Sequence, residues 1–325
     1  MSSTAQDSEI ALIHKLGDLL HELPSSVEVI PGGLGDWPSL TPEFPVLLAE
    51  GNAGIPNKVL LRLYLCALSL FNPLRSNLRD YRWSDGQSRM LLNTTAIILL
   101  ANPAHQTALN SRKRLVQSGR LLVPQELGFN RNHLCSCRES AKQSILWNHR
   151  EWLLRRQYIG DNISPCNIPA AVLQKELDLI MKCSEIYPRN YHAWAHWHFC
   201  LEMVHREELY SFLTAAYLRL VQWVERNVSD YTAIHHLYNT ARRLQTISLE
   251  KTASLQVEVD ATPRACFDHA MALVSRYPEH ESLWMYLRAV CQDTESRDRV
   301  MERVCSLPEN EHRRRCVLWL NRSSQ

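Results

Sequence analysis

His192 and His196 are spaced so that their side chains could bind a metal ion together. They stand four residues apart, so on a helix both side chains share one face, where two imidazoles can bind a metal ion. The strong form of this motif has a glutamate directly after the first histidine, whereas this chain has Ala193. Further ligands could come from His198, His235 and His236. A metal-dependent hydrolase using His192 and His196 is one hypothesis, although chance proximity among 14 histidines explains the pair better.

A second group of potential metal ligands is formed by His133, Cys135 and Cys137, but no fourth ligand is spaced to close a structural zinc site. The ten cysteines contain no Cys-x-x-Cys pair. The first fifty residues lack a basic start followed by an apolar core and a small-residue cleavage site. We therefore expect reduced thiols, a cytoplasmic location and no metal bound by this chain.

Composition restricts the class of partner. Hydrophobic residues make up 45% and charged residues 22% of the 325 residues, which is typical of a globular protein with a substantial core. A formal net charge of +2 gives no reason to expect a nucleic-acid partner. The longest apolar runs, 59–71 and 90–101, are short and are interrupted by Arg62 and Asn93, so no transmembrane segment is expected.

The stretch at residues 187–200, YPRNYHAWAHWHFC, has the strongest helix signal. Pro188 ends the preceding helix because it lacks a backbone N–H, and Asn190 can then cap a new helix by accepting a hydrogen bond from a free N–H. Apolar and aromatic residues follow at helical spacing on nearly every side. A helix of this kind packs among other helices.

Related segments recur along the chain. With Trp194 as the reference residue, the equivalent positions are Leu109, Trp147, Ile234 and Trp284. Successive positions lie 38 to 50 residues apart, in the range of helical solenoid repeats. Each copy reads as a helix, a short turn and a second helix that carries the reference residue.

This periodicity predicts an all-α fold, a right-handed superhelical stack of helical hairpins (an α-α solenoid). Residues 1–56 are expected to form an N-terminal helix and a loop-like linker, because 24–56 is rich in Pro and Gly and no convincing strand pattern occurs in the chain. Residues 57–325 are expected to form the repeat domain, with five repeats in 87–292. Helices are expected at 1–22, 58–71, 87–101, 105–118, 144–157, 169–186, 190–204, 207–226, 230–245, 262–276 and 280–292, followed by a capping pair at 295–306 and 309–320. Long loops are expected at 165–169 and 246–263.

Four segments share a more specific pattern: RNYHAWAHW at 189–197, QSILWNHREW at 143–152, YPEHESLW at 277–284 and TALNSRKRL at 107–115. They resemble the repeats of protein prenyltransferase α subunits, whose core pattern is Asn-Tyr-x-x-Trp-x-x-Arg. The likeness covers roughly residues 87–292. It is greatest to the branch of prenyltransferase α-subunit repeat-containing proteins.

The resemblance implies a crescent-shaped α subunit that wraps around a β subunit built as an α/α barrel. In the family the β subunit holds the catalytic zinc and the isoprenoid pocket. This chain is then expected to bind no cofactor of its own, with geranylgeranyl diphosphate as co-substrate of the pair.

The resemblance also implies one supporting catalytic cation. The family places a lysine beside the diphosphate, five residues before the tryptophan of the second repeat, and that position is Lys142. A leaving diphosphate gains negative charge, which a nearby cation stabilises. The tyrosine expected two residues later is Ser144, and a solvated surface lysine is the alternative interpretation. The matching positions of the third repeat, expected to face substrate or partner, are Arg189, Tyr191 and His192.

Other repeat positions are expected to be structural. Trp147, Trp194 and Trp284 are interpreted as core residues that hold adjacent hairpins together. Arg112 and Arg150, three residues after the reference position, either bridge repeats or point at a partner's carboxylates, and each needs an acid within reach. The same position is hydrophobic in the other copies, namely Trp197, Leu237 and Leu287.

Three functional hypotheses result. The first is the α subunit of a protein geranylgeranyltransferase, paired with a Rab-type β subunit and acting on a membrane-traffic protein with a C-terminal cysteine. The second is a helical-repeat adaptor without transferase activity. The third is the metal-dependent hydrolase.

Overall fold

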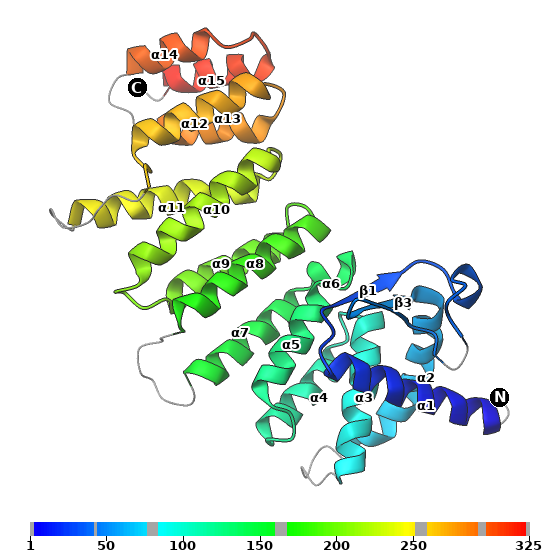
Figure 1. Ribbon diagram of the computed structural model, residues 1–325. Coiled ribbons are helices and arrows are strands. Elements are labelled where there is room, and N and C mark those ends of the chain that lie inside the picture. Colours follow the sequence, from blue (N-terminus) through cyan, green and yellow to red (C-terminus); the bar gives the residue numbers. More distant parts are fainter. Residues whose placement is uncertain are drawn as a thin grey trace. The chain divides into compact units, whose positions relative to one another are not determined.

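The computed structural model describes residues 3–41, 44–76, 84–159, 168–250, 259–291 and 297–322 (Figure 1). These residues form fifteen α-helices and one small sheet. The expectation of an all-α fold of helical hairpins is confirmed. The chain divides into two compact units. Unit 1 comprises residues 1–167 and 179–199, and unit 2 comprises residues 168–178 and 200–325.

Unit 1 begins with a mixed α/β segment. Its elements are α1 (Ser3–His21), β1 (Ser26–Ile30), the 3-10 helix η1 (Leu34–Asp36), β2 (Leu47–Ala49), β3 (Asn52–Pro56), α2 (Asn57–Ser76) and α3 (Asp85–Ala101). The strand order is β1-β3-β2, with β1 parallel and β2 antiparallel to β3. The expectation that residues 24–56 contain no strands is therefore wrong.

Two local signals explain this sheet. In β1 the buried Val27 is followed by the exposed Glu28, so apolar and polar residues alternate as a half-buried strand requires. Glu50 and Gly51 join β2 to β3 with φ angles of 50° and 78°. Positive φ at both central residues is the geometry of a two-residue hairpin turn whose twist matches the strands.

The N-terminal segment is packed into unit 1. Helix α1 lies against α2 and α3, and Ile13 of α1 and Ile55 of β3 are fully buried. Gly17 allows this close approach, because a Cβ at that position would clash with the Asn93 side chain on α3. The segment expected to be a linker is therefore part of the core.

The rest of unit 1 contains the first repeats. Its elements are α4 (Gln106–Gln117), α5 (Val123–Leu134), α6 (Arg138–Ala141), α7 (Ser144–Tyr158) and parts of α8 (Ala170–Ile186) and α9 (Tyr191–Met203). Sequence periodicity missed α5 and α6. Helix α5 contains Pro124 and Gly128 and several polar residues, which weaken its apolar pattern, yet it packs against α7 as the first helix of that hairpin.

Unit 2 continues with three pairs of consecutive helices that pack against each other. They are α10 (Leu209–Arg226) with α11 (Tyr231–Glu250), α12 (Pro263–Arg276) with α13 (Glu281–Cys291), and α14 (Arg297–Cys305) with α15 (Glu311–Arg322). Helix α11 extends to residue 250, so the loop expected from residue 246 is wrong in its first part, and residues 251–258 lie outside the described residues. Residues 165–167 of the other expected loop also lie outside them. No helix in the described ranges is long and apolar enough to cross a bilayer.

A recurrent cap sets the register of the repeats. In three of the five repeats, a side-chain atom of the residue four positions before the reference residue accepts the backbone N–H three positions further on, and Asn310 accepts the same bond at the start of α15. The bonds are Ala108 to His105 Nδ1 (3.1 Å), Ala193 to Asn190 Oδ1 (3.1 Å), Ala233 to Asp230 Oδ1 (3.1 Å) and Arg313 to Asn310 Oδ1 (2.8 Å). Each satisfies a backbone N–H at a helix start. Helix α15, expected to belong to the C-terminal capping pair, therefore begins with the same kind of side-chain N-cap as the repeats of Leu109, Trp194 and Ile234.

Candidate functional site

Lys142 lies between α6 and α7, next to the aromatic ring of Tyr187. Its Nζ is 3.7 Å from Glu139 Oε1 and 5.8 Å from the centre of the Tyr187 ring. The Arg138 guanidinium lies 5.0 Å from the centre of the same ring. Two cations therefore share one aromatic ring, and one of them also contacts an exposed carboxylate.

The start of α9 is held beside Lys142 by the preceding residue. Asn190 Nδ2 donates to the backbone oxygen of Ala141 at 2.7 Å, and Trp147 Nε1 donates to the same oxygen at 2.9 Å. In unit 2, Asn310 and Trp284 share the backbone oxygen of Pro278 in the same way, at 2.9 and 2.6 Å. The contact is thus a repeated feature of the fold.

Three residues expected to face substrate or partner lie at this helix start. Arg189 is exposed and has a φ of 60°, a left-handed conformation that is strained for arginine. Tyr191 is 70% exposed, and His192 is partly exposed. We call the set Arg138, Lys142, Tyr187, Arg189, Tyr191 and His192 the α9 rim. Its cations and the helix start together favour a negatively charged group.

The histidine pair does not converge on a metal site. His196 is buried, and its ring stacks on Phe199 at 5.2 Å and lies 5.2 Å from the Trp147 ring. Its Nδ1 is 3.5 Å from Glu151 Oε1. Within the described ranges, no group of three or more His, Cys, Asp or Glu side chains is placed to hold a metal ion; His133, Cys135 and Cys137 form no such group either.

The repeat tryptophans are buried. Exposed fractions are 2% for Trp147, 0% for Trp194 and 1% for Trp284. At the position three residues later, the hydrophobic copies Trp197, Leu237 and Leu287 are also fully buried. These side chains lie on the buried face of the second helix of their repeats.

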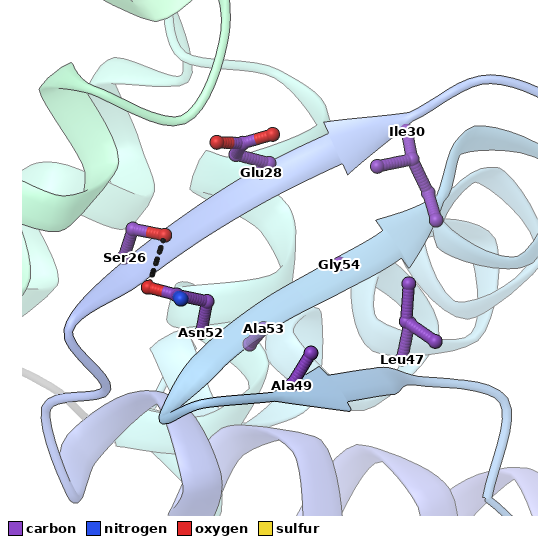
Figure 2. Close-up of a pocket in the computed structure, with 8 residues that line it drawn as sticks. All are labelled: Ser26, Glu28, Ile30, Leu47, Ala49, Asn52, Ala53 and Gly54. Carbon is purple, nitrogen blue, oxygen red and sulfur yellow. Dashed lines mark hydrogen bonds between the residues drawn. The ribbon is translucent and has the colours of Figure 1, made fainter.

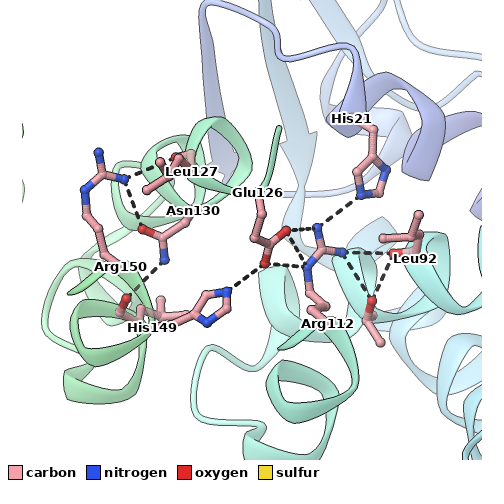
Figure 3. A network of polar contacts seen from close by, with 10 residues as sticks. His21, Leu92, Arg112, Glu126, Leu127, Asn130, His149 and Arg150 are labelled. Atoms are coloured by element: carbon pink, nitrogen blue, oxygen red, sulfur yellow. Dashed lines mark hydrogen bonds and ion pairs between the residues drawn. The ribbon is translucent and has the colours of Figure 1, made fainter. Parts of the chain in front are cut away.

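Arg112 is the centre of a buried polar network in unit 1 (Figure 3). Its guanidinium contacts both Glu126 oxygens at 2.6 to 3.1 Å. It also donates to Leu92 O and Thr95 Oγ1 on α3, both at 3.2 Å, and lies 3.2 Å from His21 Nε2 at the end of α1. Arg112, on α4, therefore joins α1, α3 and α5. Of the two interpretations offered by the sequence, this contact pattern is that of an arginine that bridges repeats.

The sequence indicated that Arg112 needs an acid within reach, because a buried unpaired arginine is costly, but it did not indicate that this acid is Glu126. His149 Nε2 lies 2.8 Å from Glu126 Oε1. Burial alone would raise the pKa of Glu126, but the charge of Arg112 and the hydrogen bonds from His149 and Arg112 outweigh it and lower the pKa to about 2. The carboxylate thus stays ionised inside the core.

Arg150, the second arginine at the equivalent position, also makes contacts within unit 1. It donates to Leu127 O at 3.1 Å and to Asn130 Oδ1 at 3.2 Å. Asn130 Nδ2 in turn donates to Leu146 O at 3.1 Å. These bonds join α5 to α7 within one hairpin.

A shallow hollow of about 300 Å³ lies on one face of the N-terminal sheet (Figure 2). Ile30 and Leu47 form its apolar end. At its polar end Ser26 Oγ donates to Asn52 Oδ1 at 2.9 Å. Glu28 is its one titratable side chain, so the hollow presents no group of residues for acid–base chemistry.

The sequence is similar to that of several known proteins. The model of the protein prenyltransferase alpha subunit repeat matches residues 173–204, which include most of α8 and all of α9. Protein prenyltransferase alpha subunit repeat-containing protein 1 of Danio rerio is 26% identical over 286 residues, covering 76% of this chain and 63% of the relative. The protein of the same name from Homo sapiens is 25% identical over 288 residues, covering 76% and 68%.

A more distant likeness is to the geranylgeranyl transferase type-2 subunit alpha of Bos taurus, with 28% identity over 181 residues, 52% of this chain and 28% of the relative. The chain thus spans under two thirds of the Danio rerio relative's length and a much smaller part of the transferase subunit.

Proposed function

Because this chain carries the protein prenyltransferase α-subunit repeat and resembles proteins named for that repeat over 76% of its length, we propose that it is the α subunit of a protein geranylgeranyltransferase. The pair with a Rab-type β subunit would transfer an isoprenoid from geranylgeranyl diphosphate to a cysteine of a membrane-traffic protein in the cytoplasm. The likeness to a type-2 transferase α subunit supports this choice of enzyme.

The observation that carries the proposal is the α9 rim. Arg138 and Lys142 lie on one aromatic ring, beside a helix start that bears Arg189 and the exposed Tyr191. Exposed aromatic and arginine side chains are common at the centre of protein interfaces. The rim is therefore the part of unit 1 that we expect to meet the β subunit.

The same residues fit the chemistry of the transfer. The cysteine thiolate attacks the first carbon of the isoprenoid while the bond from that carbon to the diphosphate oxygen breaks. Negative charge then grows on the departing diphosphate, and Lys142 would stabilise it from the α-subunit side. Zinc, expected on the β subunit, would lower the pKa of the acceptor cysteine so that its thiolate can attack.

A second candidate is an adaptor that keeps the scaffold without the transferase activity. Lys142 already contacts Glu139 and Tyr187, so its charge is partly compensated within the chain. Ser144 also stands where the family pattern has tyrosine. The hydrolase based on His192 and His196 has no comparable support, because His196 is buried against Trp147 and Phe199.

Co-expression with a Rab-type geranylgeranyltransferase β subunit tests the first proposal. An equimolar complex on size-exclusion chromatography that transfers labelled geranylgeranyl to a peptide ending in cysteine supports it. A complex without transfer favours the adaptor, and failure to form a complex contradicts the proposed subunit role. The β subunit alone is the control for background transfer.

A further inference from the structure

Two cysteine thiols face each other inside unit 1. Cys135 caps the C-terminal end of α5, and Cys183 lies on α8. Their sulfur atoms are 4.0 Å apart, although the residues are 48 positions apart in sequence. The Cys183 thiol also lies 3.7 Å from the backbone oxygen of Leu134. The pair is thus held together by the packing of α8 on the end of α5.

The two thiols have different surroundings. Cys135 is partly exposed, whereas Cys183 is fully buried. The hydrogen bond with Cys183 and the charges of Arg131, Arg150 and Lys182 lower the pKa of Cys135 despite its burial. The same hydrogen bond and burial raise the pKa of Cys183. A partly exposed cysteine with a lowered pKa, in contact with a buried thiol, is the usual arrangement of an oxidisable pair.

We propose that Cys135 and Cys183 form a reversible intramolecular disulfide when the protein meets hydrogen peroxide. The Cys135 thiolate attacks one peroxide oxygen, the O–O bond breaks, and Cys135 sulfenic acid and hydroxide form. The Cys183 sulfur then attacks the sulfenic sulfur, its proton leaves with the hydroxyl group as water, and the S–S bond forms. Peroxide is reduced and the two thiols lose two electrons.

The geometry requires only a small local movement. A disulfide has an S–S distance of about 2 Å, so the sulfurs must approach each other by about 2 Å from their present separation. Rotation of the two side chains would supply this movement. The new bond would enclose the segment that carries Lys142 and Trp147, and would tie α5 covalently to α8.

Peptide mapping of the full chain tests the site. The protein is treated with graded hydrogen peroxide, blocked with N-ethylmaleimide and digested with trypsin without reductant. We expect peptide 132–138 linked to peptide 183–189, and loss of the link after dithiothreitol. Trypsin leaves Cys135 and Cys137 in one peptide, so the mapping is repeated in Cys137→Ser, where the link should persist.

Two variants separate the roles of the sulfurs. Cys183→Ser should remove the link and raise dimedone labelling of Cys135 at least tenfold, because the sulfenic acid is no longer consumed. Cys135→Ser should remove both signals. Cys183→Ala provides a second variant if the serine disturbs packing, and Cys305→Ser, at an exposed cysteine, should match the wild-type chain.

The result that would overturn the proposal needs no variant. If Cys305 is oxidised in the wild-type chain while Cys135 and Cys183 both remain free to react with N-ethylmaleimide after denaturation, the pair is not an oxidation site. Loss of the link in Cys137→Ser would also overturn it, because the bond would then involve Cys137.

Discussion

Arg112 and Glu126 form an ion pair in which neither side chain is exposed to solvent. The Arg112 Nη2 lies 2.6 Å from Glu126 Oε2, and both side chains have an exposed fraction of 0%. Arg112 comes from the first repeat, and its other hydrogen bonds reach α3 and His21 at the end of α1. The pair thus fastens the N-terminal segment to the repeats.

Replacing Glu126 by glutamine should strongly destabilise the chain. The side chain keeps its size, but the Arg112 charge is left buried without a counter-charge, which costs about 3 to 5 kcal/mol. Urea unfolding followed by circular dichroism measures this change in the free energy of unfolding. Asp85→Asn is the matched control, because Asp85 pairs with Arg120 while fully exposed, and its effect should stay below about 1 kcal/mol.

Stability should fall as the pH drops from about 6.5 to about 4. Burial, with a smaller contribution from the charge of Arg112, lowers the pKa of His133 from 6.5 to about 4; burial and Arg112 also lower the pKa of His21 to about 4. Between these values the unfolded chain binds protons that the folded chain does not, so acid favours unfolding. The free energy of unfolding, measured across this range, should decrease with decreasing pH.

His133→Leu isolates one part of this dependence. Between pH 6.5 and 4, the free energy of unfolding of this variant should fall by up to about 3 kcal/mol less than that of the wild-type chain, since each pKa unit corresponds to about 1.4 kcal/mol. A pH profile identical to that of the wild-type chain would contradict the lowered pKa of His133. Glu126 acts at lower pH: its pKa of about 2 means that its contribution is lost as the pH falls from about 4.5 towards 2.

Trp194→Ala should destabilise the chain by about 3 to 5 kcal/mol, because Trp194 is fully buried and its removal leaves a large cavity. Thermal melting compares this variant with Tyr191→Ala, three residues earlier on the same helix. Tyr191 is 70% exposed, so its replacement should change stability by less than about 1 kcal/mol. Equal melting temperatures for the two variants would contradict the core role of Trp194.

If the chain is the proposed α subunit, Lys142→Ala should lower turnover of its complex with the β subunit by about 100-fold and leave subunit association unchanged, because the proposal places the Lys142 charge beside the leaving diphosphate in the transition state. Single-turnover transfer of labelled geranylgeranyl and size-exclusion chromatography measure the two effects separately.

Lys182→Ala is the matched control, since Lys182 also pairs with a glutamate three positions away, at 3.3 Å, on an exposed helix surface. It should not change turnover. Unchanged turnover in Lys142→Ala would show that Lys142 is a surface lysine with no part in the transfer.

The helical repeats could be predicted because their signal is local. Pro188 ends one helix, Asn190 caps the next, and Trp194 follows one turn later, so a few neighbouring residues determine the unit. Asn190 does accept the Ala193 N–H. The same reasoning failed for α5, because Pro124 and Gly128 weaken its helical sequence pattern and packing against α7 stabilises the helix.

The sheet and the buried ion pair depend on residues far apart in the chain. Val27 and Ala53 become partners only when β1 pairs with β3, and Arg112 meets His21 across 91 positions. No spacing rule connects such residues. The sequence could indicate only that Arg112 needs an acid, and the tertiary structure decided that the acid is Glu126 of the same chain.

The sequence by itself determined most of the repeat helices, the Asn190 cap and the buried tryptophans, because backbone hydrogen bonding and apolar periodicity act over a few residues. Only the tertiary structure decided which side chains share one environment: Lys142 beside Tyr187, Cys135 beside Cys183, and Arg112 beside Glu126. These contacts arise when the packing of whole helices brings distant segments together, and burial then alters the charge and reactivity of the groups that meet.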